Sequence, residues 1–127
     1  MVESLKAESG RRKIKVLILE DSDSRRRVFR ENLSEDCSLH FFDTVRDAKR
    51  AIETQGPFDL IYLDHDLDQR IFVDSEEENT GYQLAKYIAE KKLGARIILH
   101  TMNPYGAARM KELLPQASHI EFPELFP

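Results

Sequence analysis

Short apolar runs alternate along this chain with segments in which apolar residues recur every three or four positions. Unbroken runs of Val, Ile, Leu and aromatic residues predict strands buried on both faces, whereas the spaced pattern predicts helices with one apolar face. Strands are therefore expected at 14–19, 37–42, 58–64, 95–101 and 118–122, and helices at 24–33, 45–54, 82–93 and 104–114. The run at 37–42 alternates imperfectly, which is typical of an edge strand.

Regular alternation of strands and helices predicts an α/β fold with a parallel sheet and helices on both faces. Right-handed crossovers and the flavodoxin-like strand order 2-1-3-4-5 would make the first, third and fourth strands neighbours. The polar residues 1–13 are expected to form a flexible tail, and residues 14–127 a single domain. Ser22 or Asp23 is the expected N-cap of the first helix, Asp43–Thr44 that of the second, and Gly94 is the expected C-terminal cap of the third.

Composition narrows the class of protein. With 127 residues, 41% hydrophobic and 33% charged, the chain is long enough for one globular core. The formal net charge of −4 gives no basic field that would attract nucleic acid or acidic lipid. The single cysteine, Cys37, excludes an intrachain disulfide, and no apolar run is long enough to span a bilayer. No secretion signal is recognised, so a reducing cytoplasm is the expected location.

Polar side chains follow the three strands that are expected to be neighbours. They are Glu20 and Asp21 after the first strand, Asp64, His65 and Asp66 after the third, and His100, Thr101 and Asn103 after the fourth. Because the carboxyl ends of parallel strands meet at one sheet edge, we expect these side chains to converge there. The long polar segment 69–80 follows the same edge, and its Ile71, Phe72 and Val73 could fold onto the site or a partner.

Carboxylates gathered in one crevice repel one another unless a cation lies among them. Oxygen ligands suit Mg²⁺ or Mn²⁺, and the expected ligands are Glu20, Asp21, Asp64 and Asp66. A coordinating histidine would favour Mn²⁺ or another transition ion. His65 and His100 could instead act as general base and acid on either side of a phosphate, or serve only as hydrogen-bonding structural residues.

Four arginines crowd the first helix, at positions 25, 26, 27 and 30. Cations near a helix N-terminus oppose the helix dipole, so their presence there needs a reason. One interpretation is a solvated face paired with neighbouring acids. The other is an anion clamp beside the acidic edge, with Arg25 as a phosphate-binding residue.

The pair Glu20 and Asp21, with Asp64 and Thr101, resembles the phosphoacceptor site of response-regulator receiver domains. The resemblance implies that the pair binds Mg²⁺ with help from the Asp66 backbone carbonyl. Asp64 would accept the phosphoryl group, and the Thr101 hydroxyl would contact it. The chain departs from receivers in having no lysine after Lys111, in carrying Phe122 before Pro123, and in leaving no room for a fifth helix.

These departures resemble one divergent branch, the cyclic-phosphate processing receiver domains. The matching segments are Leu63–Leu67, Thr80–Tyr82 and His100–Pro104, followed by Gly106, Ala107 and Met110. The resemblance implies metal-assisted hydrolysis of a cyclic phosphate on a small molecule or a nucleic-acid end. His65 or His100 would activate water or protonate the leaving oxygen, and Asn103 and Thr101 would hydrogen-bond a phosphoryl oxygen.

Two alternatives remain open at the level of sequence. The chain could be a conventional phosphoacceptor that signals through Asp64. It could also be an inactive pseudo-receiver that binds a protein partner or a second copy through the face left open by the missing fifth helix. Phe122, Leu125 and Phe126 could cover that face instead.

Overall fold

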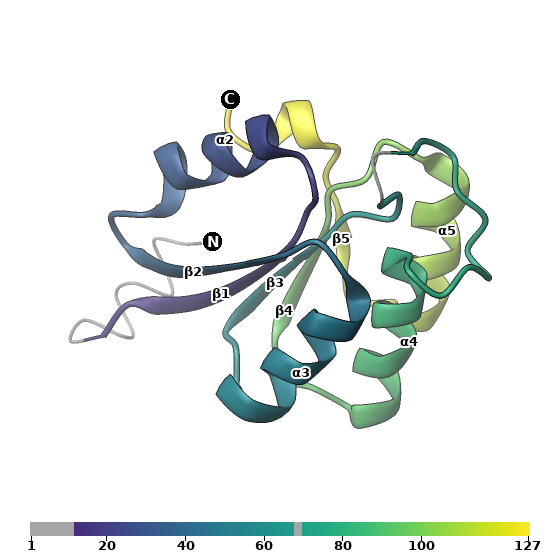
Figure 1. Cartoon of the computed structure of the whole chain (residues 1–127), viewed down its shortest axis with the longest axis horizontal. Helices are drawn as coiled ribbons and strands as arrows, with labels where there is room; N and C mark the ends of the chain where they lie inside the picture. The colour runs from purple at the N-terminus through teal and green to yellow at the C-terminus, as the bar shows by residue number, and fades with distance from the viewer. Residues whose placement is uncertain (1–11, 68–69) are drawn as a thin grey trace.

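The computed structural model describes residues 12–67 and 70–127 and shows one parallel sheet with the order β2-β1-β3-β4-β5 (Figure 1). The strands are β1 (Ile14–Leu19), β2 (Cys37–Phe42), β3 (Leu60–Leu63), β4 (Arg96–Leu99) and β5 (Ser118–His119). Four α-helices connect them: α2 (Asp23–Leu33), α3 (Val45–Gln55), α4 (Gly81–Lys91) and α5 (Pro104–Leu113). The flavodoxin-like α/β fold predicted from the sequence is confirmed.

Alternation along the strands divides the core between the two faces of the sheet. Leu19, Leu63 and Leu99 belong to a buried cluster with residues of α3, α4 and α5. Ile18, Tyr62 and their neighbours belong to a second cluster with residues of α2. Figure 1 shows α3, α4 and α5 on one side of the sheet and α2 on the other. Continuous apolar strands are buried on both faces because helices cover both.

The capping predictions are partly confirmed. The Ser22 hydroxyl accepts from Arg25 N–H and the Thr44 hydroxyl from Asp47 N–H, as expected of N-caps. Gly94 as the cap of α4 is wrong. The helix ends at Lys91, and its C-cap is Lys92, which takes the left-handed conformation with φ 53° and donates its N–H to the Ala89 and Ile88 carbonyls. Lysine here accepts a backbone conformation that usually favours glycine.

The segment after β5 covers the α2 face of the sheet. It forms a short 3-10 turn at Phe122–Glu124, and its apolar side chains pack against the second cluster. The ring of Phe29 lies 5.9 Å from that of Phe122 and 5.7 Å from that of Phe126. Binding of a protein partner or a second copy on this face stays a prediction.

Two further expectations concern the N-terminal tail and membrane-spanning helices. Residues 1–11 of the expected tail lie outside the described residues. Arg12 is described and forms a salt bridge with Asp59 at 2.8 Å. Within residues 12–67 and 70–127, no helix combines the length and apolar character needed to cross a bilayer.

Candidate functional site

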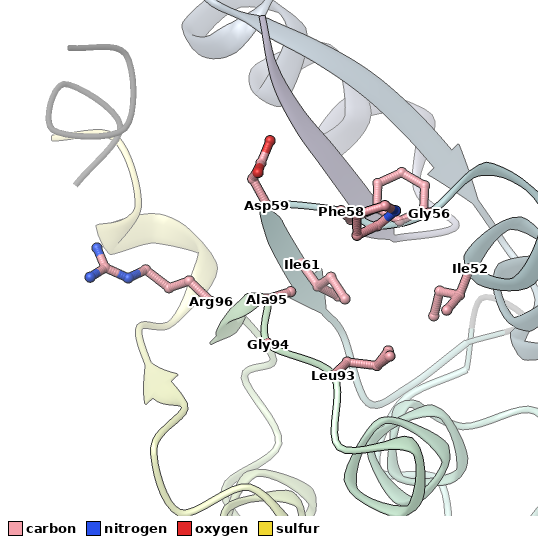
Figure 2. A pocket seen from close by; sticks show the side chains of 10 residues that line it. Ile52, Gly56, Phe58, Asp59, Ile61, Leu93, Gly94, Ala95 and Arg96 are labelled. Atoms are coloured by element: carbon pink, nitrogen blue, oxygen red, sulfur yellow. The ribbon is translucent and has the colours of Figure 1, made fainter. Parts of the chain in front are cut away.

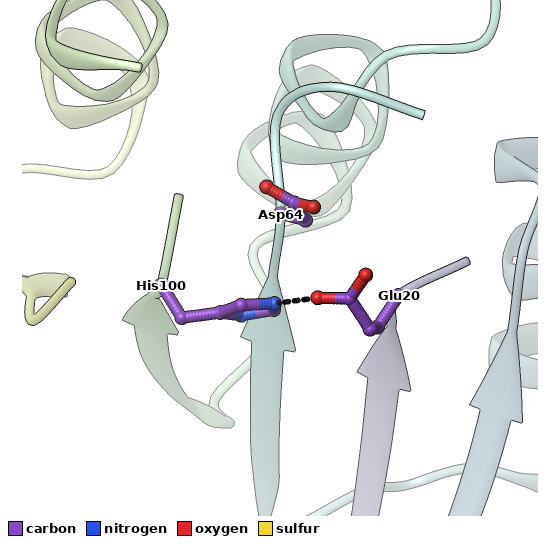
Figure 3. A group of neighbouring side chains, drawn as sticks. All are labelled: Glu20, Asp64 and His100. Carbon is purple, nitrogen blue, oxygen red and sulfur yellow. Dashed lines mark hydrogen bonds and ion pairs between the residues drawn. The ribbon is translucent and has the colours of Figure 1, made fainter. Parts of the chain in front are cut away.

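The strand register brings three polar residues side by side. Leu19 is paired with Leu63, and Leu63 with Leu99, so the next residues along the three strands are Glu20, Asp64 and His100. Figure 3 shows their side chains together at the carboxyl ends of β1, β3 and β4. All three are buried, with exposed fractions of 1%, 5% and 0%. The expected convergence at this sheet edge is confirmed.

Glu20 is held from several sides. Its Oε1 lies 2.9 Å from His100 Nε2, and its Oε2 accepts from Ser22 N–H at 3.0 Å. Burial alone would raise the pKa of this carboxyl. The hydrogen bond and charge of His100, with Ser22 N–H and the Arg25 guanidinium, outweigh burial and hold the Glu20 pKa below its usual value. Glu20 is therefore a buried carboxylate in its ionised form.

Asp64 is in the opposite electrostatic position. Burial, reinforced by the negative charge of Glu20, raises the pKa of Asp64 to about 6, although His100, Arg25 and the His65 N–H act against the rise. The Arg25 guanidinium lies 3.8 Å from Asp64 Oδ2 and 3.7 Å from Glu20 Oε1. One cation thus stands beside two buried carboxyl groups, and an additional cation would stabilise their ionised forms.

The imidazole of His100 is enclosed by aromatic rings. Phe29, Tyr62 and Phe122 have ring centroids 5.4, 6.2 and 6.4 Å from that of His100. Its Nε2 faces Glu20, while its buried Nδ1 has no hydrogen-bond partner among the described residues. Since a carboxylate accepts, the Glu20 contact requires a proton on His100 Nε2. The ring orientation is thereby fixed toward Glu20.

His65 lies at the same edge but makes different contacts. Its Nδ1 is 2.7 Å from Asp66 Oδ1, and its Nε2 is 2.7 Å from the Ser75 hydroxyl. The ring packs against α5 so closely that a Cβ on Gly106 would lie 2.4 Å from it. His65 is fully buried, with both ring nitrogens in hydrogen bonds. The structure therefore places it in a structural network and brings only His100 to Glu20 and Asp64.

The carboxylate of Asp66 is the centre of that network. Besides His65, it accepts from Asn103 Nδ2 at 3.1 Å and from the N–H groups of Phe72 and Val73 at 2.8 and 3.0 Å. Burial opposes ionisation, but these four hydrogen bonds hold the pKa of Asp66 below its usual value. Asp66 thus fastens the segment after β3 to the N-terminus of α5.

A cleft of about 660 Å³ opens over this edge. Its lining comes from α2 and its approach, from the ends of β3 and β4, and from the segment after β3: Glu20, Asp21, Ser22, Asp23, Ser24, Arg25, Asp64, Asp66, Arg70, Ile71, Phe72, Thr101, Met102 and Asn103. All the predicted site residues except His65 and His100 are in this lining. His100 lies behind this lining and contacts it through the hydrogen bond to Glu20.

A second cleft of equal volume has a different character. It lies at the opposite ends of β3 and β4 and is lined mainly by apolar residues. Figure 2 shows Ile52, Ile61 and Leu93 around the hollow, with Asp59 and Arg96 directed away from it. The Asp59 carboxylate is engaged by Arg12 and by Lys15 N–H. The polar side chains that could bind a metal or a phosphate therefore lie mainly at the first cleft, at the carboxyl ends of the strands.

The donor set at the first cleft fits a divalent cation. One ligand atom each from Glu20, Asp64 and His100 lies within 4.8 Å of the others, so all three could reach one ion. Two carboxylate oxygens and an imidazole nitrogen suit Mn²⁺, and the carboxylates with water suit Mg²⁺. Asp21 lines the same cleft and could add a further oxygen.

Sequence reasoning missed some parts of this site. Ser75, which is buried against His65, sits in a polar run whose other residues are mostly exposed. Phe122, whose ring lies 4.8 Å from the Arg25 guanidinium carbon, was not predicted to contact a site residue. No pattern of spacing signals either contact, because each joins separate segments through tertiary packing.

Several solved structures that share this fold are receiver domains or response regulators. The signal receiver domain of an HD domain-containing protein from Pseudomonas fluorescens is 18% identical, with a TM-score of 0.72, covering 89% of this chain and 85% of that one. The non-phosphorylated HemR receiver domain from Leptospira biflexa is 23% identical, with a TM-score of 0.67 and coverages of 86% and 82%. The response regulator TrrA from Thermotoga maritima, in complex with Mg²⁺–BeF, is 20% identical, with a TM-score of 0.67 and coverages of 87% and 86%.

No match was found among curated proteins. The family described as "Cyclic-phosphate processing Receiver domain" matches residues 15–116, a range that contains every predicted site residue from Glu20 to Asn103. The fold, the three strand ends that meet at one edge and this match agree: the chain belongs to the cyclic-phosphate processing receiver domain family.

Proposed function

We propose that this protein is a metal-dependent phosphoesterase that opens a cyclic phosphate or a related phosphoester at the Glu20–Asp64–His100 edge. The observation that supports it is the joint burial of two carboxyl groups and an imidazole within 4.8 Å of one another, beside a cleft of about 660 Å³. Burying these groups lowers the stability of the fold, and burial raises the pKa of Asp64 because it disfavours the ionised carboxylate. Such arrangements are typical of functional sites.

Glu20 and Asp64 would hold Mg²⁺ or Mn²⁺, with Asp21 beside them in the cleft. When bound, the cation polarises a phosphoryl oxygen and neutralises charge that develops on it. Asp66 takes a supporting role, because its carboxylate already accepts four hydrogen bonds from His65, Asn103, Phe72 and Val73. Arg25, which stands next to both carboxyl groups, attracts and orients the anionic substrate.

His100 is the proposed acid–base residue. Its ring lies behind the cleft lining with Nε2 at 2.9 Å from Glu20 Oε1, so it would exchange a proton with the cleft through the Glu20 carboxylate. Thr101 accepts from Asn103 N–H, so its own hydroxyl hydrogen is available to a phosphoryl oxygen in the cleft. Asn103 donates to Asp66 and caps α5 through its Oδ1, which keeps it at the cleft wall. His65 serves to position Asp66 rather than to contact substrate.

A test compares wild type with Asp64→Asn and His100→Ala, using a cyclic phosphate and Mg²⁺ or Mn²⁺. We expect turnover by wild type and a loss of roughly 10²-fold or more in each variant. Asp47→Asn, an exposed carboxylate on α3 outside the cleft, is the matched control and should retain full activity. Calorimetry with the metal alone separates the roles: metal affinity that collapses in His100→Ala would make this residue a ligand.

The alternative function is phosphoacceptance at Asp64, which the likeness to receiver domains supports. Incubation with a small phosphodonor and Mg²⁺, followed by intact-mass measurement, distinguishes the two. A stable phosphoryl adduct that Asp64→Asn abolishes would favour the receiver function. Turnover of a cyclic phosphate without an adduct favours the enzyme.

A further inference from the structure

Exposed apolar side chains gather around the candidate cleft. Among the described residues, the large hydrophobic side chains that are exposed are Ile71 at 80%, Phe72 at 66%, Met102 at 47% and Tyr105 at 81%. Three of them, Ile71, Phe72 and Met102, line the cleft that contains Glu20 and Asp64. Exposed apolar groups concentrated at one place mark a binding surface more often than scattered ones do.

Phe72 is held in place by its backbone. Its φ is 52°, a left-handed conformation that is strained for an aromatic residue. The N–H groups of Phe72 and Val73 donate to the two oxygens of Asp66, and the Val73 side chain is buried at 7% exposure. The protein therefore maintains an unfavourable conformation while leaving the Phe72 ring in solvent. Strain of this kind is retained where a side chain has to be presented to a partner or ligand.

The rest of the segment is anchored in the same way. Ser75 is buried and contacts His65 Nε2 through its hydroxyl, while its carbonyl accepts from Thr80 Oγ1 at 3.1 Å and Gln83 Nε2 at 2.9 Å. These bonds tie the segment to α4 on one side and, through Asp66, to the site on the other. The apolar surface is consequently preorganised, which lowers the entropy lost on binding a ligand.

The apolar surface continues directly from the proposed phosphate site. Met102 Sδ lies 3.6 Å from an Arg25 Nη2, and the same guanidinium stands 3.8 Å from Asp64 Oδ2. A cleft of about 660 Å³ is the size that encloses a whole organic ligand, far more than a phosphate group requires. The organic part of the phosphoester would therefore lie against Ile71, Phe72 and Met102.

We propose that Ile71, Phe72 and Met102 bind the base of a mononucleotide whose phosphate lies beside Asp64 and Arg25. This inference rests on the proposed function and names its substrate class. A planar base stacks on an aromatic ring and packs against the thioether of methionine. The formal net charge of −4 disfavours a long polyanionic strand, so a mononucleotide fits better than a nucleic-acid chain.

The test uses two ligands that differ only in the base, adenosine 5′-monophosphate and ribose 5-phosphate. Calorimetry is carried out in Mg²⁺ on wild type, Phe72→Gly and Tyr105→Ala. In wild type we expect the nucleotide to bind roughly 10-fold more tightly or better. Phe72→Gly should remove that preference and leave the affinity for ribose 5-phosphate unchanged. Tyr105→Ala, which removes an exposed aromatic ring outside the cleft lining, should keep the preference.

Phe72→Gly also carries an internal control for folding. Glycine adopts positive φ without strain, so the variant should unfold at the same temperature as wild type or higher. A loss of binding in a protein of undiminished stability is then a loss of contact with the ligand.

The outcomes separate this inference from the proposed function. Equal affinity for the two ligands in wild type, or a preference that survives in Phe72→Gly, overturns the base-binding surface and leaves the phosphate site standing. Failure of both ligands to bind in Mg²⁺ overturns the base-binding surface, whereas the proposed function is overturned by absence of cyclic-phosphate turnover. Tighter binding of a 5′-phosphorylated dinucleotide than of the mononucleotide would contradict the assignment to a mononucleotide.

Discussion

Asp64 and Asp66 show how strongly the immediate surroundings determine the chemistry of one residue type. Only His65 separates them in the chain, yet burial beside Glu20 raises the pKa of Asp64 to about 6, while four hydrogen bonds hold the pKa of Asp66 below its usual value. The first carboxyl group is destabilised when ionised and the second is stabilised. The two should therefore respond in opposite directions to the same substitution.

The metal-free Asp64→Asn variant is expected to be more stable than wild type at neutral pH. Because the folded-state pKa of Asp64 is raised from 3.8 to about 6, its favourable contribution is present below pH 4 and is lost as pH rises through 6. Asparagine does not ionise, so the variant avoids this loss. Its gain in the free energy of unfolding over wild type should be about 3 kcal/mol at pH 8 and should vanish near pH 4. Thermal unfolding in a chelator at both pH values measures this.

Asp66→Asn is the matched comparison and should be less stable than wild type at neutral pH. An amide cannot accept from His65, Asn103 and two backbone N–H groups with the strength of a carboxylate. With a depressed pKa, the contribution of Asp66 is present above its unfolded-state pKa and lost as pH falls. Stabilisation of both variants at pH 8 would contradict this account of the two environments.

At the scale of secondary structure, the apolar pattern predicted the number, type and order of elements. It overestimated three strands: those expected at 58–64, 95–101 and 118–122 pair only over Leu60–Leu63, Arg96–Leu99 and Ser118–His119. Phe58 and Ile120 pack against the core beyond these strand bounds, although Ile120 N–H still donates to the Leu99 carbonyl at 3.0 Å. Hydrophobic residues report burial, whereas strand ends depend on backbone pairing, which the pattern does not contain.

For the site, the sequence likewise predicted which residues meet but not the contacts that each one makes. Strand order and register placed Glu20, Asp64 and His100 on one edge. The different environments of the two histidines were not predictable, since they follow from the turn that β3 makes after Leu63. His65 meets Ser75 and α5, whereas His100 meets Glu20 and the aromatic residues of the α2 face.

The start of α4 offers a sharp test of how one element supports the site. Gly81 N–H donates to the His65 carbonyl at 2.9 Å, and a Cβ on Gly81 would lie 1.8 Å from the Asp64 carbonyl oxygen. Neither backbone can move without displacing Asp64. Gly81→Ala should therefore lower the free energy of unfolding by about 3 kcal/mol or more and weaken metal binding.

Gly94→Ala provides the control for Gly81→Ala. A Cβ on Gly94 meets nothing within 4 Å, and its φ is not positive. Alanine there should be neutral or stabilise the protein by about 0.4–1 kcal/mol through the unfolded state. Chemical denaturation of both variants measures the difference, and similar losses of stability would show that the close approach at Gly81 is tolerated.

At the scale of the whole molecule, the sheet needs cover on the α2 face, and the C-terminal segment supplies it. Phe29 of α2 contacts Phe122 and Phe126 on one side and the His100 ring on another. Phe122 in turn lies under the Arg25 guanidinium. The segment that follows β5 therefore completes the core and supports both Arg25 and His100 at the site.

Phe126→Ala tests this dual role. Removing a partly buried ring that contacts Phe29 should lower the free energy of unfolding by about 1–2 kcal/mol, whereas Phe126→Leu, which keeps apolar bulk, should lose less than half of that. The alanine variant exposes Phe29 and its neighbours, so light scattering should also detect self-association at high concentration. Wild-type protein that is already dimeric, with Phe126→Ala monomeric, would show instead that this face binds a second copy, because the ring would then belong to an interface between chains.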